Sequence, residues 1–182
     1  YVVKYMNLEK YQQYSRIARG LEKADLVLKD ARIVNVFTEE IIRGDIAIQD
    51  GIIAGIGSFH GKEERDLAGR YVCPGFIDSH LHLESTLVTP AELVTVASRH
   101  GTTTFIVDPH ESANVSGLAG IDYILEQTED VKANVYVMMP SCVPATGIDD
   151  NGCTLTAQDM APYLNNSRIL GLGEVMDSIS VV

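Results

Sequence analysis

Residues 71–82, YVCPGFIDSHLH, decide how the rest of the sequence is interpreted. The stretch begins as an apolar run that contains Gly75 and ends in two histidines, His80 and His82. Downstream, further strand-like runs alternate with segments of helical spacing and recur about every 30 residues, the length of one βα unit. This repeat predicts an α/β fold in which parallel strands are joined by helices.

Four strand-like runs of this kind follow residue 70. Residues 104–107 and 135–139 are rich in apolar side chains, as is typical of parallel strands that are covered on both faces. Two architectures agree with the repeat, an open doubly wound sheet and a (β/α)8 barrel of the TIM type. Because a barrel needs about eight strands, residues 71–182 would supply only its first four βα units, and the rest would lie beyond Val182.

The residues before this repeat begin with a predicted helix. Residues 4–20 place apolar and aromatic side chains such as Tyr5 and Tyr11 at helical spacing, and Gly20 is a suitable stop. We therefore expect an amphipathic helix, packed on the body of the protein, within residues 1–20.

A small β-sandwich-like domain is expected at residues 21–70. Apolar and polar side chains alternate over residues 24–57, with turn-forming pairs at Arg43-Gly44 and Asp50-Gly51, and this pattern predicts hairpins. The charged residues 61–70 should form a surface connection to the barrel units.

The balance of charge argues against some classes of partner. The sequence has 25 acidic and 14 basic residues and a net charge of −11, which repels nucleic acids and anionic membranes. No apolar run reaches the roughly 18 residues of a membrane-spanning helix, and the first twenty residues lack the pattern of a secretory signal. The three cysteines include no C-x-x-C pair, so free thiols are expected. We expect a cytoplasmic protein with neither nucleic acid nor membrane as a partner.

Polar side chains follow each predicted strand at the point where the strand ends. Because the carboxyl ends of parallel strands lie on one edge of a sheet, these groups should converge although they are far apart in sequence. They are His80 and His82 after the first strand, Asp108 and His110 after the second, Ser141 and Cys142 after the third, and Glu174 after the fourth.

The two histidines and Glu174 are candidate metal ligands. In an extended segment residues i and i+2 point to the same side, so His80 and His82 can reach one ion while Leu81 packs away from it. A carboxylate such as that of Glu174, beside Gly173, can bridge two cations. The alternative is that the histidines are ordinary surface or core residues and that the glutamate caps a helix or pairs with an arginine.

Asp108 and His110 are expected in the active site, with roles that the residues alone leave open. Asp108 could bind a metal, bind substrate, transfer a proton, or orient one of the two histidines. We assign both to the catalytic group together with Glu174. Substrate contacts are predicted for Glu84, Ser141 and Cys142.

The segment PGFIDSHLH at residues 74–82 resembles the first-strand signature of the amidohydrolase superfamily, and the hairpin-rich residues before it resemble the small β domain that accompanies the barrel there. Within the superfamily, the sequence is similar to the adenine deaminase family over most of its length. The similar segments are HLEST at 82–86, DPHE at 108–111, PSCVPAT at 140–146 and GLGEVM at 171–176.

This resemblance implies the N-terminal part of a metal-dependent aminohydrolase that converts adenine to hypoxanthine and ammonia through a metal-activated hydroxide. It implies a binuclear centre of manganese or iron, with zinc as an alternative, in which His80 and His82 bind one metal and Glu174 bridges both. The family's other histidine ligands and its proton-shuttling aspartate would lie beyond Val182, so this chain alone should be inactive. Adenine as a small-molecule partner and a homo-oligomer are also expected.

Two other functions remain open. The first is a cyclic amide hydrolase of the dihydroorotase or hydantoinase type, although these relatives commonly have a carboxylated lysine on the fourth strand, where this chain has Glu174. The second is a truncated barrel half that acts as a non-catalytic structural or binding module.

Overall fold

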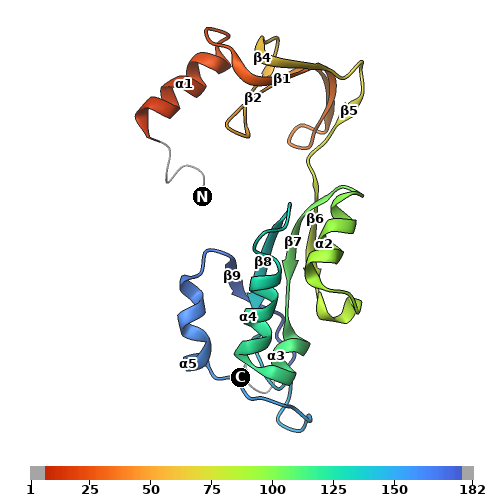
Figure 1. Ribbon diagram of the computed structural model, residues 1–182, viewed down its shortest axis with the longest axis vertical. Coiled ribbons are helices and arrows are strands. Elements are labelled where there is room, and N and C mark those ends of the chain that lie inside the picture. The colour runs from red at the N-terminus through yellow and green to blue at the C-terminus, as the bar shows by residue number, and fades with distance from the viewer. Residues whose placement is uncertain (1–6, 178–182) are drawn as a thin grey trace. The chain divides into compact units, whose positions relative to one another are not determined.

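The computed structural model describes residues 7–177 and divides the chain into two compact units, residues 1–74 and 75–182 (Figure 1). The first six residues of the expected N-terminal helix, with Tyr5, lie outside the described residues. The three-part division expected from the sequence stays a prediction.

Helix α1, Leu8–Ala18, opens the described part of the first unit. The side chain of Asn7 caps it by accepting a hydrogen bond from the main-chain N–H of Lys10 at 2.9 Å. Gly20 follows with a φ of +71°, a left-handed conformation that suits glycine after a helix end. Ile17 is fully buried and joins the core of the small sheet, so this helix packs on its own unit.

A five-stranded sheet forms the body of the first unit, in the order β3-β2-β1-β4, with β5 also paired to β1. The pairs β1–β2 and β2–β3 are antiparallel, whereas β4 and β5 run parallel to β1. The strands are β1 (Ala24–Asn35), β2 (Glu40–Gln49), β3 (Ile52–Gly57), β4 (Gly61–Asp66) and β5 (Tyr71–Val72).

Only one of the two predicted hairpin turns is correct. Asp50 and Gly51 form the turn between β2 and β3, with φ values of +50° and +76° that are typical of a tight hairpin. Arg43 and Gly44 instead lie inside β2, where they pair with β1. Gly44 suits this place because a Cβ on it would lie only 3.2 Å from the carbonyl oxygen of Gly57 on β3.

The charged segment after β3 is a strand, which corrects the expectation of a plain surface connection. Residues 61–66 form β4, paired in parallel with β1, and every residue after Gly61 is exposed. Charged side chains suit such an edge strand because they discourage pairing with other chains. The absence of apolar alternation hides the strand in the sequence.

The second unit is built on a four-stranded parallel sheet in the order β6-β7-β8-β9, so the parallel α/β prediction is confirmed (Figure 1). Helical segments connect each strand to the next. In chain order the elements are β6 (Phe76–Leu81), η2 (Glu84–Thr86), α2 (Pro90–Ser98), β7 (Thr102–Val107), α3 (His110–Ser116), α4 (Leu118–Gln127), β8 (Asn134–Met139), α5 (Ala157–Met160), η3 (Ala161–Asn165) and β9 (Ile169–Leu172).

One set of strand side chains in this sheet packs with the helices in a buried core. Phe105 and Val137 are buried together with Val94 of α2 and Ile124 of α4. Intervening side chains such as Tyr136 are only partly buried. The described residues therefore cover one face of the strands more fully than the other, where the sequence predicts two covered faces.

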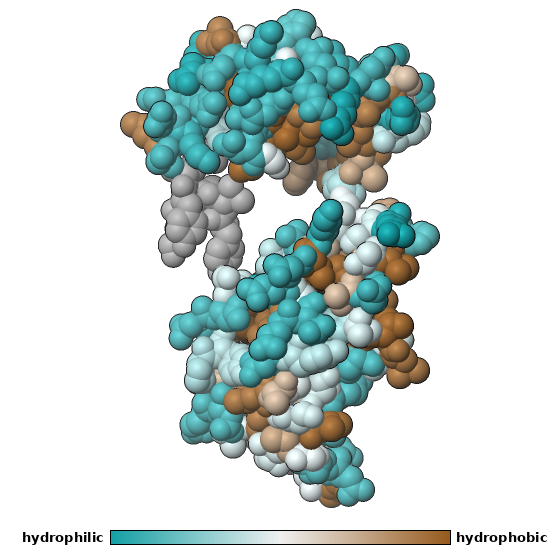
Figure 2. Space-filling view, viewed as in Figure 1, coloured by the Kyte–Doolittle hydropathy of each residue, from teal (hydrophilic) through white to brown (hydrophobic). Residues whose placement is uncertain are grey.

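On the face seen in Figure 2, each unit mixes hydrophilic side chains with smaller hydrophobic patches. Within residues 7–177, no helix is long and apolar enough to cross a membrane.

Candidate metal centre

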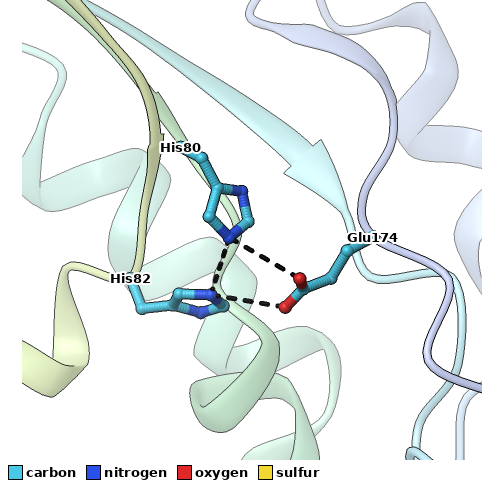
Figure 3. A group of neighbouring side chains, drawn as sticks. All are labelled: His80, His82 and Glu174. Carbon is cyan, nitrogen blue, oxygen red and sulfur yellow. Dashed lines mark hydrogen bonds and ion pairs between the residues drawn. The ribbon is translucent and has the colours of Figure 1, made fainter.

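Three predicted ligands meet at the carboxyl end of the parallel sheet (Figure 3). His80 is the next-to-last residue of strand β6, His82 follows that strand, and Glu174 follows β9. The Nε2 atoms of the two histidines are 3.1 Å apart. The carboxylate oxygens of Glu174 lie 3.7 Å from Nε2 of His80 and 3.5 Å from Nε2 of His82.

The donor atoms of this group fit a divalent cation. One nitrogen from each histidine and a carboxylate oxygen of Glu174 all lie within 4.8 Å of one another, so a single ion could contact all three. Neutral imidazole and carboxylate are common ligands of zinc, iron and manganese. Leu81, between the histidines, packs against the hydrophobic core, as the alternation of side chains along a strand requires.

Glu111 contacts one of the two histidines, His82. Its Oε2 atom lies 2.8 Å from Nδ1 of His82, and its Oε1 atom accepts a hydrogen bond from the hydroxyl of Ser85 at 3.3 Å. An Nδ1–H donated to this carboxylate leaves the Nε2 lone pair of His82 directed at Glu174 and His80.

The sequence predicts no role for Glu111, which lies in the DPHE motif at 108–111. The signal in the sequence is its place in the first turn of helix α3, beside Asp108 and His110, which follow strand β7. Burial acts to raise the pKa of Glu111, but hydrogen bonds from its own main chain, from Glu84 and from His82 outweigh burial and lower it. The pKa of Glu84 is raised, first by burial and further by the neighbouring Glu111 carboxylate.

Asp108 lies next to the centre, behind the main chain of Glu174. It is only 1% exposed, and its Oδ2 atom accepts a hydrogen bond from the Glu174 N–H at 3.1 Å. Its Oδ1 atom is buried without a hydrogen-bond partner among residues 7–177. Burial raises the pKa of this carboxyl.

The remaining predicted residues surround this group in different ways. The hydroxyl of Ser141 donates to the main-chain carbonyl of Glu174 at 2.6 Å, and Cys142 follows it. Glu84 accepts a hydrogen bond from the main-chain N–H of Ser112 at 3.1 Å. His110 begins helix α3, and its Nδ1 atom is buried with no partner in the described part of the chain. The predicted catalytic and substrate-binding roles stay predictions.

Residues 71–173 match the model of the amidohydrolase family, which is more than half of the chain. The chain belongs to this family.

Two solved amidohydrolase-fold structures resemble it at low sequence identity and support the fold alone. N-acyl-D-glutamate deacylase from Bordetella bronchiseptica, complexed with zinc and a phosphonate inhibitor, has a TM-score of 0.53 at 20% identity and covers 77% of this chain and 34% of its own. Atrazine chlorohydrolase from Arthrobacter aurescens TC1, complexed with zinc, has a TM-score of 0.64 at 16% identity. The match covers 86% of this chain and 48% of the chlorohydrolase chain.

This amidohydrolase chain is also similar to curated adenine deaminases. It is 58% identical over 177 residues to the adenine deaminase of Desulfitobacterium hafniense (strain Y51). The matched residues make up 97% of this chain and 31% of that relative. It is 52% identical over 155 residues to the adenine deaminase of Geobacillus kaustophilus (strain HTA426). Here the matched residues make up 85% of this chain and 27% of the relative. The chain thus spans about a third of the length of these relatives.

Proposed function

We propose that this chain supplies the N-terminal part of a metal-dependent adenine deaminase, which hydrolyses adenine to hypoxanthine and ammonia. The observation that carries the proposal is the convergence of His80, His82 and Glu174 at one sheet edge. The high identity to curated adenine deaminases supports the choice of substrate.

The residues present have separate tasks in this proposal. His80 and His82 offer neutral nitrogens to a divalent cation, and Glu174 offers two oxygens that are able to bridge a pair of cations. A cation held by these residues would make a nucleophilic water available near neutral pH. Manganese or iron in a binuclear arrangement remains our proposal, with zinc as the alternative that the zinc-bound neighbours support.

The reaction replaces the amino group at C6 of adenine with oxygen from water. Water adds to C6, one of its protons passes to the departing nitrogen, and ammonia leaves, so that adenine and water give hypoxanthine and ammonia. Asp108 and His110 are our candidates for proton transfer or for support of the centre, and Glu84, Ser141 and Cys142 are our candidates for substrate contacts.

The proposed whole protein is a (β/α)8 barrel of which residues 71–182 form the first four units, beside a small β-sandwich-like domain. The four parallel strands β6 to β9 and the amidohydrolase-fold neighbours support this architecture. A homo-oligomeric state and a cytoplasmic location belong to the proposal as predictions from the sequence.

The test is an assay on the full-length protein that carries this sequence, after reconstitution with Mn²⁺, Fe²⁺ or Zn²⁺. We expect adenine to be converted to equal amounts of hypoxanthine and ammonia, with no turnover of dihydroorotate or hydantoin. Hydrolysis of a cyclic amide without deamination of adenine would contradict the proposal. A stable, metal-free protein with no turnover of any of these compounds would favour a non-catalytic module.

A further inference from the structure

The main chain of Glu174 lies beyond the end of its sheet. The pairing of β8 with β9 ends where Met139 is opposite Leu172, and the N–H of Gly173 makes one more bond, to the carbonyl of Met139 at 2.6 Å. From Glu174 onward the strand ladder no longer holds the peptide groups, so other groups must bond them if the residue is to keep one orientation.

Side chains from two other strand ends bond both main-chain polar groups of Glu174. Its N–H donates to Oδ2 of Asp108, directly after β7, at 3.1 Å. Its carbonyl accepts from the hydroxyl of Ser141, shortly after β8, at 2.6 Å. The residue is therefore held on both sides, by the ends of the two strands that precede β9 in the sheet.

The local packing is adapted to the contact with Asp108. A carboxylate that is 1% exposed is unfavourable unless hydrogen bonds compensate it, and the N–H of Glu174 supplies such a bond. A Cβ on Gly173 would overlap the Oδ2 atom of Asp108, so the carboxylate can approach only because this residue is glycine.

We propose that Asp108 and Ser141 are positioning residues that hold the main chain of Glu174 so that its carboxylate faces His80 and His82. The inference rests on the proposed function, because it takes Glu174 as a metal ligand. Several rotatable bonds separate that carboxylate from its main chain. If either main-chain hydrogen bond is lost, the carboxylate should therefore adopt a wider range of positions. In this role Asp108 accepts one hydrogen bond from the Glu174 N–H, and Ser141 donates one to the Glu174 carbonyl.

The first test compares Mn²⁺ binding by titration calorimetry in the full-length protein and its variants. Asp108→Ala and Ser141→Ala should weaken binding about 10- to 100-fold, the range seen when groups that orient metal ligands are removed. Asp108→Asn should stay within about threefold of the wild type, because its amide oxygen accepts the same hydrogen bond. The matched control is Ser98→Ala, whose hydroxyl also bonds a main-chain carbonyl, that of Val94 in helix α2 at 2.7 Å.

The second test measures hydrogen exchange at the Glu174 amide in metal-free protein. Exchange should be slow in the wild type and in Asp108→Asn, and at least about tenfold faster in Asp108→Ala. Gly173→Ala should also speed exchange, because the added methyl group displaces the carboxylate. Fast exchange in the wild type, or Mn²⁺ affinities of Asp108→Ala and Ser141→Ala equal to that of the wild type, would overturn the proposal. If the wild type binds no Mn²⁺ while exchange still responds to Asp108→Ala, the positioning role stands and the proposed function fails.

Discussion

The Oε2 atom of Glu111 lies 2.8 Å from Nδ1 of His82, on the side of the imidazole ring opposite the nitrogen that approaches Glu174. Such a carboxylate behind a histidine selects the tautomer and holds the ring in one orientation. This contact links helix α3 to the candidate metal centre, and a substitution of Glu111 alone can test its contribution to metal binding.

Removal of this carboxylate should weaken metal binding without unfolding the protein. We expect Glu111→Ala to reduce Mn²⁺ affinity about 10- to 100-fold, as is usual when a group behind a metal-bound histidine is lost. Glu111→Gln should lose less, because its amide oxygen still accepts from Nδ1. Calorimetric titration measures the affinity, with the exposed Glu126 of helix α4 changed to alanine as the control. If Glu111→Ala binds Mn²⁺ as tightly as the wild type, Glu111 has no role in the metal centre.

The three candidate ligands should be individually essential. His80→Ala, His82→Ala and Glu174→Ala should each lower the metal content of the purified full-length protein and reduce turnover of adenine by at least about 100-fold, because in the proposed function the cation would supply the nucleophilic water. Elemental analysis and an adenine-to-hypoxanthine assay measure the two effects. His100→Ala, at an exposed histidine after helix α2, should leave both unchanged. Full metal content and turnover in all three ligand variants would refute the site assignment.

The sequence was informative where one local rule determined the geometry. The alternation of side chains along a strand predicted that His80 and His82 lie together, and the repeat of βα units predicted that Glu174 reaches the same edge of the sheet. Both expectations are met by the interatomic distances.

Other features depend on tertiary contacts that no local pattern encodes. Strand β4 is charged and exposed, so only its pairing with β1 defines it. The sequence pattern around Gly44 is typical of a turn, but the residue lies inside β2, where the Gly57 carbonyl oxygen approaches it closely. The role of Glu111 follows from a contact with a histidine that is 29 residues earlier in the chain.

Arg168 should be important for the stability of the second unit. Its guanidinium donates to the carbonyls of Val135 at 3.0 Å and Leu125 at 2.8 Å, and also to the hydroxyl of Thr128, so it joins the end of helix α4 to strand β8. Arg168→Met should lower the free energy of unfolding by about 2 to 4 kcal/mol, because it removes three hydrogen bonds from a charged group to partly buried acceptors.

Urea denaturation of the Arg168→Met variant tests this expectation. Arg99→Met, at an exposed arginine after helix α2, is the matched control and should change stability by less than about 0.5 kcal/mol. Equal denaturation midpoints for the two variants would show that the three hydrogen bonds of Arg168 contribute little.

Asp45 should make the stability of the first unit depend on pH. It is 8% exposed, pairs with Lys29, and accepts hydrogen bonds from the main-chain N–H groups of Asp30 and Phe59, each at 3.1 Å. Burial alone would raise its pKa, but the bonds from Lys29, Phe59 and Asp30 outweigh burial, and the pKa is lowered. Asp45→Asn should therefore cost about 2 to 3 kcal/mol at neutral pH.

The sign of the pH dependence follows from the lowered pKa. A carboxyl whose pKa is lower in the folded than in the unfolded state contributes stability above the unfolded value, about 3.9 for aspartate, and loses it as pH falls through the folded value. The difference in unfolding free energy between wild type and Asp45→Asn should therefore be constant from about pH 7 to pH 5 and shrink below about pH 4. Urea denaturation at a series of pH values measures it. A difference that stays constant down to about pH 2 would mean that Asp45 titrates alike in both states, so that neither Lys29 nor the two amides stabilise its charge.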